Sequence, residues 1–415
     1  MCLRNAILYL NKQKIINDPV YGFISIKTPL IFDLIEHPYF QRLRYIKQAG
    51  MTHLVYPGSL HTRFHHAIGA LHLMQLAIEH LQNKGHKITE EEAEAVCIAI
   101  LLHDIGHGPF SHALEHSLVK GIPHETISRL FMDELNKAFD GNLDLALKIF
   151  NNHYPKKFLF QLISGQLDLD RLDYLNRDSF FSGVSEGTVS SERIIKLLNV
   201  KDGNLVVEEK GIYSVEKFLI ARRVMYWQVY LHKTVIAGEQ LLVNILKRAR
   251  ELAQQNVALF ATPALKHFLY NEISGGQFVN DGEHLSLFSQ LDDHDITTSV
   301  KVWQEHEDLV LSTLCKSFIN RRLYKVEISN EKPDVARVAA LKERVIAALG
   351  IGKDEVSYFV FTDSITNTAY DSKKGSIKIL RKNGEVEDIA VVSDTSSLEA
   401  LSNEVTKNFL CYLKI

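Results

Sequence analysis

The chain has 415 residues, of which 46% are hydrophobic and 23% charged, enough for one large core and a smaller second domain. Its net charge of -3 gives no general attraction to nucleic acid or to anionic membranes, so we expect no strong nucleic-acid binding and no membrane association. The four cysteines lie far apart, and no apolar run approaches the roughly 18 residues of a membrane span. These features predict a cytoplasmic protein with reduced thiols.

The N-terminal part predicts a short hairpin followed by helices. Residues 14–32 form short extended pieces separated by turn-forming residues, which is typical of a hairpin. From Ile31 to about Gln48 the apolar spacing becomes helical, and His37-Pro38 marks a boundary between two helices. A further helix begins at Arg63 and carries an inward apolar stripe.

The stretch Ile100–His112 begins inside the segment with the clearest core pattern. Residues 95–102 are hydrophobic nearly all round, which predicts a buried helix that carries His103 and Asp104 into the interior. A buried carboxylate needs a cation, because leaving it unpaired costs several kcal/mol. Glycine and proline at positions 106, 108 and 109 then break the helix, and Pro123 opens the next one.

The following segments continue the helical pattern. Residues 167–178 predict a helix whose acids at 168, 170, 173 and 178 need cations or water. Residues 183–214 are expected to form loops or a hairpin, and residues 215–254 a long helical stretch. The polar stretch 274–294 is expected to form a loop.

The composition changes after residue 325. Runs of β-type residues occupy 326–328, 358–361, 377–380 and 389–392, and helices are expected near 334–348 and 397–408. We therefore predict a mainly α protein with a helical domain over residues 1–325 and a small α+β domain over residues 326–415.

Four residues at helix ends have the chemistry of a divalent-metal site: His66, His103, Asp104 and Asp170. Two neutral imidazoles and two carboxylates offset a 2+ ion and leave positions for water and substrate. Possible donors to phosphate oxygens surround them in the sequence, which indicates an anionic substrate: Arg63, His107, His112, His124 and Arg171.

Each of these residues also has an ordinary structural interpretation. A single histidine is more often a hydrogen-bonded core or surface residue than a ligand, and we assign His72, His80, His86 and His153 to that class. The acids of residues 168–178 would likewise suit a solvated face or pairing with nearby arginines. The buried helix before His103 favours the metal site.

The order His66, His103-Asp104, Asp170 resembles the ligand arrangement of the HD-domain metal-dependent phosphohydrolases. Five segments are similar to their deoxynucleoside triphosphate (dNTP) triphosphohydrolase branch, which includes dGTPase-like enzymes: Asn17–Gly22, Phe40–Gln48, Arg63–His66, His103–His112 and Leu169–Tyr174. The resemblance covers about residues 14–325 and includes no SAM domain. It implies an HD-domain helical phosphohydrolase core.

The resemblance also implies roles for individual residues. One divalent ion, which these ligands do not distinguish among Mg, Mn, Fe, Zn and Ni, would be held by His66, His103, Asp104 and Asp170. His124 would protonate the leaving oxygen with Glu125 orienting it, and Asp104 and His107 are further catalytic candidates. The candidates for phosphate contact are Arg63, His107, His112, Arg171, Tyr174, Arg222 and Lys233.

The sugar contacts implied by the resemblance are Gln48 and Asp178 at the 3′-hydroxyl and Tyr230 under the deoxyribose, although Tyr230 also suits simple helix packing. The implied reaction is attack of water on the α-phosphorus of a dNTP, releasing deoxynucleoside and tripolyphosphate. The preferred base is left open. The protein would work as a homo-oligomer, a dimer or a tetramer.

Regulated relatives bind an activating nucleotide at positions matched here by Lys14, Asn17, Gln41 and Arg44. Glu36 stands where those relatives have an aspartate that reads guanine, and ordinary surface ion pairs are the alternative interpretation of this group. Two other functions stay open. The protein could be an HD phosphohydrolase for another phosphoester, such as a nucleoside monophosphate or signalling nucleotide, or a nucleotide-binding module without turnover.

Overall fold

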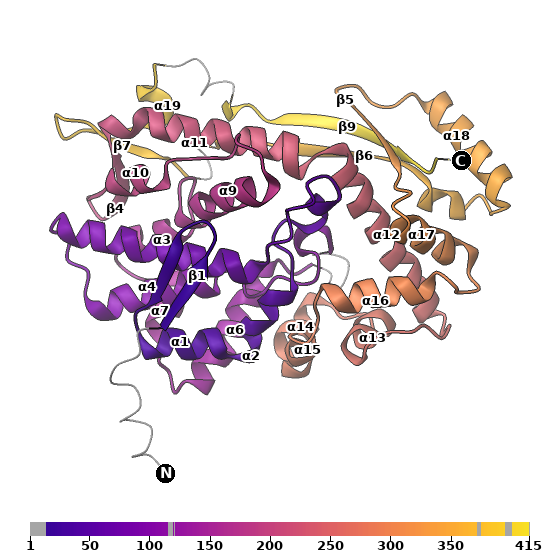
Figure 1. Cartoon of the computed structure of the whole chain (residues 1–415), viewed down its shortest axis with the longest axis horizontal. Helices are drawn as coiled ribbons and strands as arrows, with labels where there is room; N and C mark the ends of the chain where they lie inside the picture. The colour runs from indigo at the N-terminus through magenta and orange to yellow at the C-terminus, as the bar shows by residue number, and fades with distance from the viewer. Residues whose placement is uncertain (1–13, 115–118, 120, 372–374, 395–400, 415) are drawn as a thin grey trace, which may run out of the picture.

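A computed structural model describes residues 14–114, 119, 121–371, 375–394 and 401–414, without the side chains of residues 112 and 113. The chain is mainly helical, with a hairpin at the start and two small sheets formed largely by later residues (Figure 1). The hairpin consists of β1 (Lys14–Asp18) and β2 (Gly22–Ile26), paired antiparallel. This confirms the predicted hairpin, although it ends before Pro29.

Three long helices form the centre of the N-terminal half. Helix α3 (Arg63–Asn83) packs against both α4 (Glu90–Leu102) and α9 (Leu169–Ser182). Helix α4 begins with a capping box between Thr89 and Glu92, and its residues 95–102 are all buried. The predicted core helix is therefore confirmed, and it ends directly before His103.

The other helices surround this centre. Pro29 starts α1 (Pro29–Glu36), two residues earlier than expected, because proline suits a first helical turn. The remaining helical segments before residue 212 are α2 (Pro38–Gln41), η1 (Arg42–Tyr45), η2 (Gly50–Leu54), η3 (Ser111–Leu114), α6 (His124–Ala138), α7 (Asp144–Phe150), α8 (Lys157–Ile163), α10 (Ser191–Lys196) and η4 (Glu209–Gly211).

The expected helical stretch over residues 215–254 is confirmed, but it is divided into three segments. Helix α11 (Ile212–Met225) passes into a π-helical turn, η5 (Tyr226–Tyr230), before α12 (Lys233–Gln254). The backbone of His232 is extended, and its ring accepts a hydrogen bond of 3.1 Å from the Thr234 amide. This cap starts a new helix.

The expected loop over residues 274–294 is wrong. It contains α14 (Gly275–Asn280) and α15 (Gly282–Phe288), whose Phe278 and Phe288 are buried against each other with ring centroids 5.7 Å apart. Two aromatic anchors and the capping box at Ser274 stabilise short helices in an otherwise polar stretch. The neighbouring helices are α13 (Pro263–Tyr270), α16 (Asp293–Trp303) and α17 (Leu309–Ile319).

The last part of the chain contributes to two sheets. One has the antiparallel order β5 (Lys325–Ser329), β9 (Val405–Tyr412), β6 (Val360–Asn367), and lies beside α12 (Figure 1). In the other, β7 (Lys378–Leu380) pairs with β8 (Val386–Asp388) and runs parallel to β4 (Asn204–Glu208), which itself pairs with β3 (Leu198–Lys201). Helix α18 (Val335–Leu349), as expected, and η6 (Glu355–Tyr358) complete this part.

Two expectations for the C-terminal part are wrong. Residues 389–392 form helix α19 (Ile389–Val392) instead of a strand, because Asp388 caps it through a 2.7 Å hydrogen bond from the Ala390 amide. Residues 405–408 of the expected helix 397–408 belong to strand β9, which lies between two partners, and residues 397–400 lie outside the described residues. Tertiary pairing decides both cases.

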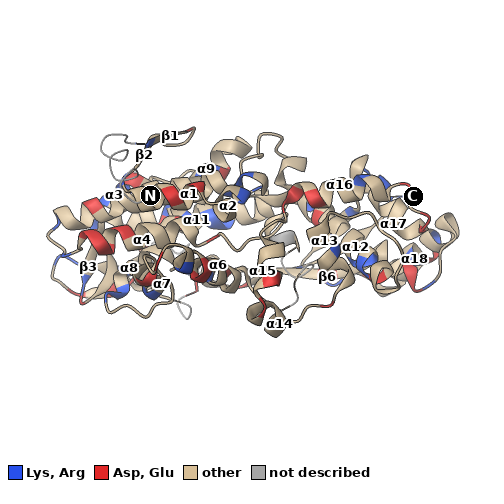
Figure 2. Ribbon diagram, turned by 90° about the horizontal axis from the view of Figure 1, so that it is seen from below, with Lys and Arg blue, Asp and Glu red and all other residues tan. Residues whose placement is uncertain are grey.

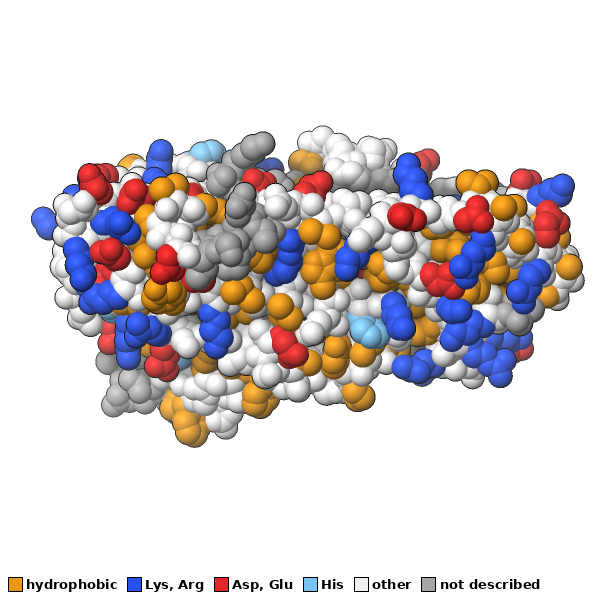
Figure 3. Space-filling view, turned by 90° about the horizontal axis from the view of Figure 1, so that it is seen from above, with side chains coloured by type: hydrophobic (Ala, Val, Ile, Leu, Met, Phe, Trp, Pro, Cys, Tyr) orange, Lys and Arg blue, Asp and Glu red, His pale blue; other side chains and the backbone are white. Residues whose placement is uncertain are grey.

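Charges of both signs alternate along the ribbon in Figure 2, in agreement with the small net charge. On the face drawn in Figure 3, hydrophobic side chains occur in small groups between polar ones, and most of the basic side chains lie towards the two ends. Among the described residues, no helix is both long and apolar enough to cross a membrane.

Candidate active site

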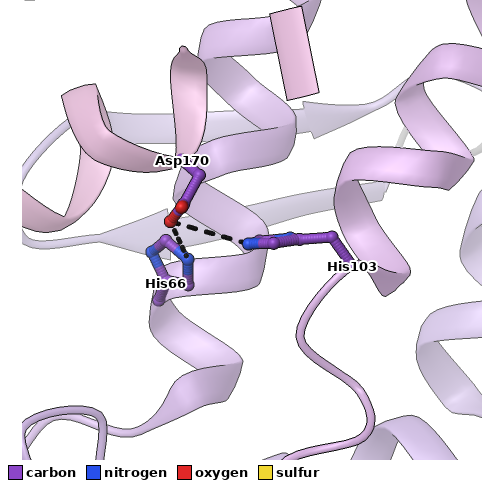
Figure 4. A group of neighbouring side chains, drawn as sticks. All are labelled: His66, His103 and Asp170. Carbon is purple, nitrogen blue, oxygen red and sulfur yellow. Dashed lines mark ion pairs between the residues drawn. The ribbon is translucent and has the colours of Figure 1, made fainter. Parts of the chain in front are cut away.

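The four predicted metal ligands converge from three helices. His66 lies in the first turn of α3, His103 and Asp104 follow the last residue of α4, and Asp170 lies in the first turn of α9. Nε2 of His66 is 3.2 Å and Nε2 of His103 is 3.6 Å from Oδ1 of Asp170 (Figure 4). Asp104 completes the group, with Oδ1 3.3 Å from His103 Nε2 and Oδ2 3.7 Å from His66 Nε2.

Hydrogen bonds on the far side of each ring fix the direction of the two imidazoles. His66 Nδ1 lies 2.8 Å from Oδ2 of Asp173, and His103 Nδ1 lies 2.6 Å from the carbonyl oxygen of Ile100. The opposite Nε2 atoms are buried and have no hydrogen-bond partner among the described residues. Two buried nitrogens facing two carboxylates fit a divalent cation with nitrogen and oxygen ligands.

The charges of the cluster support the same interpretation. Burial alone would lower the pKa of His66, but Asp170 and Asp173 outweigh it and raise the pKa to about 10. Burial also favours a higher pKa for Asp104 and Asp170, but the neighbouring imidazoles, and Arg63 beside Asp104, hold both pKa values below the ordinary range. The carboxylates of Asp104 and Asp170 thus stay ionised, and their negative charge favours a cation in the space between them.

A second group lies next to the first and contains the predicted acid catalyst. His107 Nε2 is 3.5 Å from Asp104 Oδ1, and the rings of His107 and His124 stack with centroids 3.8 Å apart. His124 Nδ1 is 3.6 Å from Oε2 of Glu125, an ion-pair distance that permits an orienting role. Atoms of Asp104, His107 and His124 lie within 4.8 Å of one another.

Arginines surround the cluster, but each has a polar partner. Arg63 donates to Ser111 Oγ at 2.8 Å and to the carboxylate of Asp104. Arg171 donates to Asp168, the residue that caps α9, and Arg222 donates to the carbonyl oxygen of Ala369 at 3.0 Å. The predicted phosphate contacts would therefore use the remaining guanidinium hydrogens.

A cavity of about 510 Å³ opens at the cluster. It is lined by most of the predicted catalytic and substrate residues: Gln48, Arg63, Asp104, His107, His124, Glu125, Asp170, Arg171, Tyr174, Asp178, Arg222 and Tyr230. Lys233 does not line it, because this exposed residue starts α12 after the extended His232. The side chain of His112 lies outside the described residues.

The predicted sugar residues lie together at one wall. Tyr230 donates a hydrogen bond to Oδ2 of Asp178, and His61 Nε2 lies 2.6 Å from its Oδ1. Gln48 has a buried amide oxygen without a hydrogen-bond partner among the described residues. The cavity therefore offers an acceptor oxygen on Gln48 to a bound hydroxyl.

The residues predicted for an activating nucleotide lie away from this cavity, on the hairpin and the first helices. Lys14 Nζ lies 4.0 Å above the ring of Phe32, and Arg44 lies 3.6 Å above the ring of Phe64. Gln41 accepts from Arg44 Nε at 2.7 Å and donates to the Ile35 carbonyl, while Asn17 lies in β1 and Glu36 ends α1.

Several residues that were not predicted from the sequence support the site. Asp173 lies between His66 and Arg177, whose Nε is 2.9 Å from Asp173 Oδ2 and whose Nη1 is 2.7 Å from Asp18 Oδ2. Arg42 supports the loop after His103 by donating to the carbonyl oxygens of Ile105 and His107 at 2.7 and 2.9 Å. A signal existed for Asp173, because it lies three positions after Asp170 on the same helix.

Two family models match the chain. The HD domain matches residues 63–178, which include all four predicted ligands, and the HD associated region matches residues 189–262. A crystal structure of a phosphohydrolase from Bacteroides thetaiotaomicron is 54% identical and superposes with a TM-score of 0.94, covering 97% of this chain and 100% of that one.

Other relatives are more distant. The uncharacterized protein YwfO of Bacillus subtilis is 32% identical over 395 residues, or 92% of this chain and 88% of that protein. The deoxynucleoside triphosphate triphosphohydrolase SAMHD1 homolog of Dictyostelium discoideum is 34% identical over 259 residues, 57% of this chain, and the match spans 49% of that relative's length. The ligand arrangement and these similarities show that the chain belongs to the HD-domain phosphohydrolases.

Proposed function

We propose that this protein hydrolyses dNTPs to deoxynucleoside and tripolyphosphate with one divalent metal ion. The observation that carries the proposal is the 510 Å³ cavity whose wall brings together Asp104 and Asp170, which contact His66 and His103, with the arginines and the sugar residues. The similarity to a dNTP triphosphohydrolase supports it. An ion held by His66, His103, Asp104 and Asp170 would supply Lewis acidity towards a phosphoryl oxygen and activate water.

The protein's own groups then have separate tasks. Arg63 and Arg171 would bind the phosphate oxygens, where their positive charge stabilises the charge that builds up in phosphoryl transfer. His107 has a pKa well below its ordinary value, through burial and the charge of Arg63, so it binds phosphate as a neutral imidazole. His124 would donate a proton to the 5′-oxygen that leaves, with Glu125 beside it.

The sugar wall would favour a deoxyribose. Gln48 and Asp178 would hold the 3′-hydroxyl, and the ring of Tyr230 would pack against the face of the sugar. Tyr230 is held in place by its hydrogen bond to Asp178 and by an edge contact with Tyr174 at 6.4 Å between centroids. A ring fixed in this way leaves little freedom to admit a further hydroxyl group.

We also propose a homo-oligomer with a nucleotide-binding site at Lys14, Asn17, Glu36, Gln41 and Arg44. The hairpin supports an interface between copies, because Ile15 and Phe23 are 55% and 73% exposed there. Light scattering tests the oligomer, and a dimer or tetramer is expected.

The decisive experiment is product identification. The protein is incubated with Mg²⁺ or Mn²⁺ and each dNTP, with and without GTP, and the products are separated by chromatography. Tripolyphosphate and deoxynucleoside are expected. Release of orthophosphate from a nucleoside monophosphate alone would favour another phosphoester, and binding without turnover would indicate a binding module.

A matched pair of variants tests the site. Asp104→Asn should abolish turnover and metal binding, whereas Asp202→Asn, in the exposed β3–β4 turn, should leave both unchanged. Full turnover by the Asp104 variant would contradict the ligand assignment.

A further inference from the structure

One acid in the cavity has no counter-charge among the residues that the structure describes. Glu239 lies in the second turn of α12 and lines the 510 Å³ cavity, but its carboxylate forms no hydrogen bond or ion pair with a described residue. Other acids in this region have such partners, as Asp104 has in Arg63 and Asp178 has in His61. Burial raises the pKa of Glu239 to about 7. A carboxylate kept half-buried without a partner is costly, so a ligand that satisfies it is the natural explanation.

The position of Glu239 indicates which part of a ligand it would meet. Its Oε1 lies 3.7 Å from where a β-carbon on Gly50 would stand, and η2, which begins at Gly50, packs against α12. Gly50 follows Gln48, the proposed sugar residue, by two positions. The carboxylate of Glu239 would repel a phosphate, so the phosphates of a bound nucleotide would lie at the arginines. The base, on the other side of the sugar, would then lie at Glu239.

We propose that Glu239 binds the base of the nucleotide and selects guanine. The two oxygens of a carboxylate accept two parallel hydrogen bonds, and the guanine edge presents N1–H and the 2-amino group as two adjacent donors. Adenine and cytosine offer one amino group beside an acceptor nitrogen, and the N3–H of thymine is flanked by two carbonyl oxygens that a carboxylate repels. This inference rests on the proposed function, because it assumes a nucleotide with its phosphates at the metal cluster.

The size of the expected preference follows from the pairing. A bidentate contact between a side chain and a base edge typically discriminates by about 10- to 100-fold. A site built around such a contact also rejects the analogue that lacks one donor, because its acceptor is then left unpaired. Hypoxanthine is that analogue, since it keeps N1–H but has no 2-amino group.

Calorimetric titration of the full-length protein in EDTA with dGTP, dITP and dATP tests the proposal without turnover. The unmodified protein should bind dGTP about 10- to 100-fold more tightly than dITP or dATP. Glu239→Gln, whose amide offers only one acceptor, should reduce this ratio to about 3 or less. Glu343→Gln, on the exposed face of α18, should keep it.

Equal affinity of the unmodified protein for dGTP, dITP and dATP would overturn the proposal, as would no binding of any of them at millimolar concentration. The same conclusion follows if Glu239→Gln keeps its full preference. The comparison among nucleotides needs no variant, so it stands even if the variant does not fold. Failure to release tripolyphosphate would instead count against the proposed hydrolysis.

Discussion

The carboxylate of Asp173 contacts both the proposed metal site and a buried arginine that stabilises the fold, and Asp173→Asn would reveal both contributions. Asp173 is fully buried and contacts His66 on one side and Arg177 on the other, at 2.8 and 2.9 Å. Asparagine keeps the shape of the side chain and removes its charge. His66 would lose the charged acceptor that orients its ring, and Arg177 would keep Asp18 as its carboxylate partner.

The two effects differ in size. Loss of a group that orients a metal ligand typically weakens metal binding 10- to 100-fold, which is about 1.4 to 2.8 kcal/mol. Removing one partner from a buried ion pair typically lowers the free energy of unfolding by about 3–5 kcal/mol. Arg177 retains Asp18, so we expect a value near 3 kcal/mol here.

Calorimetric titration with Mn²⁺ measures the first effect, and urea unfolding of the metal-free protein measures the second. Asp18→Asn is the matched control, because it also removes a carboxylate from Arg177, at 2.7 Å, but does not touch His66. This control should lose stability and keep its metal affinity within about threefold. Equal loss of metal affinity in both variants would refute the orienting role of Asp173.

Three further predictions concern separate parts of the molecule. Gly69→Ala should lower the free energy of unfolding by about 3 kcal/mol in urea titrations, because its methyl group would overlap the side chains of Asp173 and Arg177. His124→Ala should reduce kcat about 10²- to 10⁴-fold in steady-state assays with little change in KM, as expected for a proton donor. Burial alone would raise the pKa of Asp308, but the hydrogen bond from Arg248 outweighs it and the pKa is lowered. The ionised Asp308 therefore stabilises the folded protein above the unfolded pKa of about 4, and this contribution is lost as the pH falls through the pKa of the folded state. Asp308→Asn should lower the free energy of unfolding by about 2 kcal/mol at pH 7 and by much less at pH 2. Thermal denaturation at the two pH values measures the difference.

The candidate metal cluster was predictable from the sequence because its residues lie at positions that the local pattern marks. The apolar run before His103 predicts a buried helix. A carboxylate at the end of a buried helix requires a cation, however the other helices are arranged. Boundaries near His37-Pro38 and Arg63 were likewise local, set by proline and by helical periodicity.

The parts that were not predictable depend on contacts between distant segments. Residues 405–408 have mixed local preferences, and their strand forms because β5 and β6 provide partners on both sides. Glu239 looks in sequence like any acid on a long helix, and only the structure shows that it faces the cavity. The partner of Asp173 was hidden in the same way, since His66 lies on another helix.

The buried ion pairs also connect the proposed nucleotide site to the metal site. Asp18 ends β1 directly after Asn17, and from there the contacts run through Arg177 and Asp173 to His66. A nucleotide that displaced β1 would first move Asp18. The contacts through Arg177 and Asp173 would then change the orientation of the His66 imidazole. Asp18→Asn should therefore keep the basal rate of dNTP hydrolysis within about threefold and reduce activation by added GTP, measured as the ratio of the two rates. An unchanged activation ratio in this variant would show that the nucleotide acts by another route, such as assembly of the oligomer.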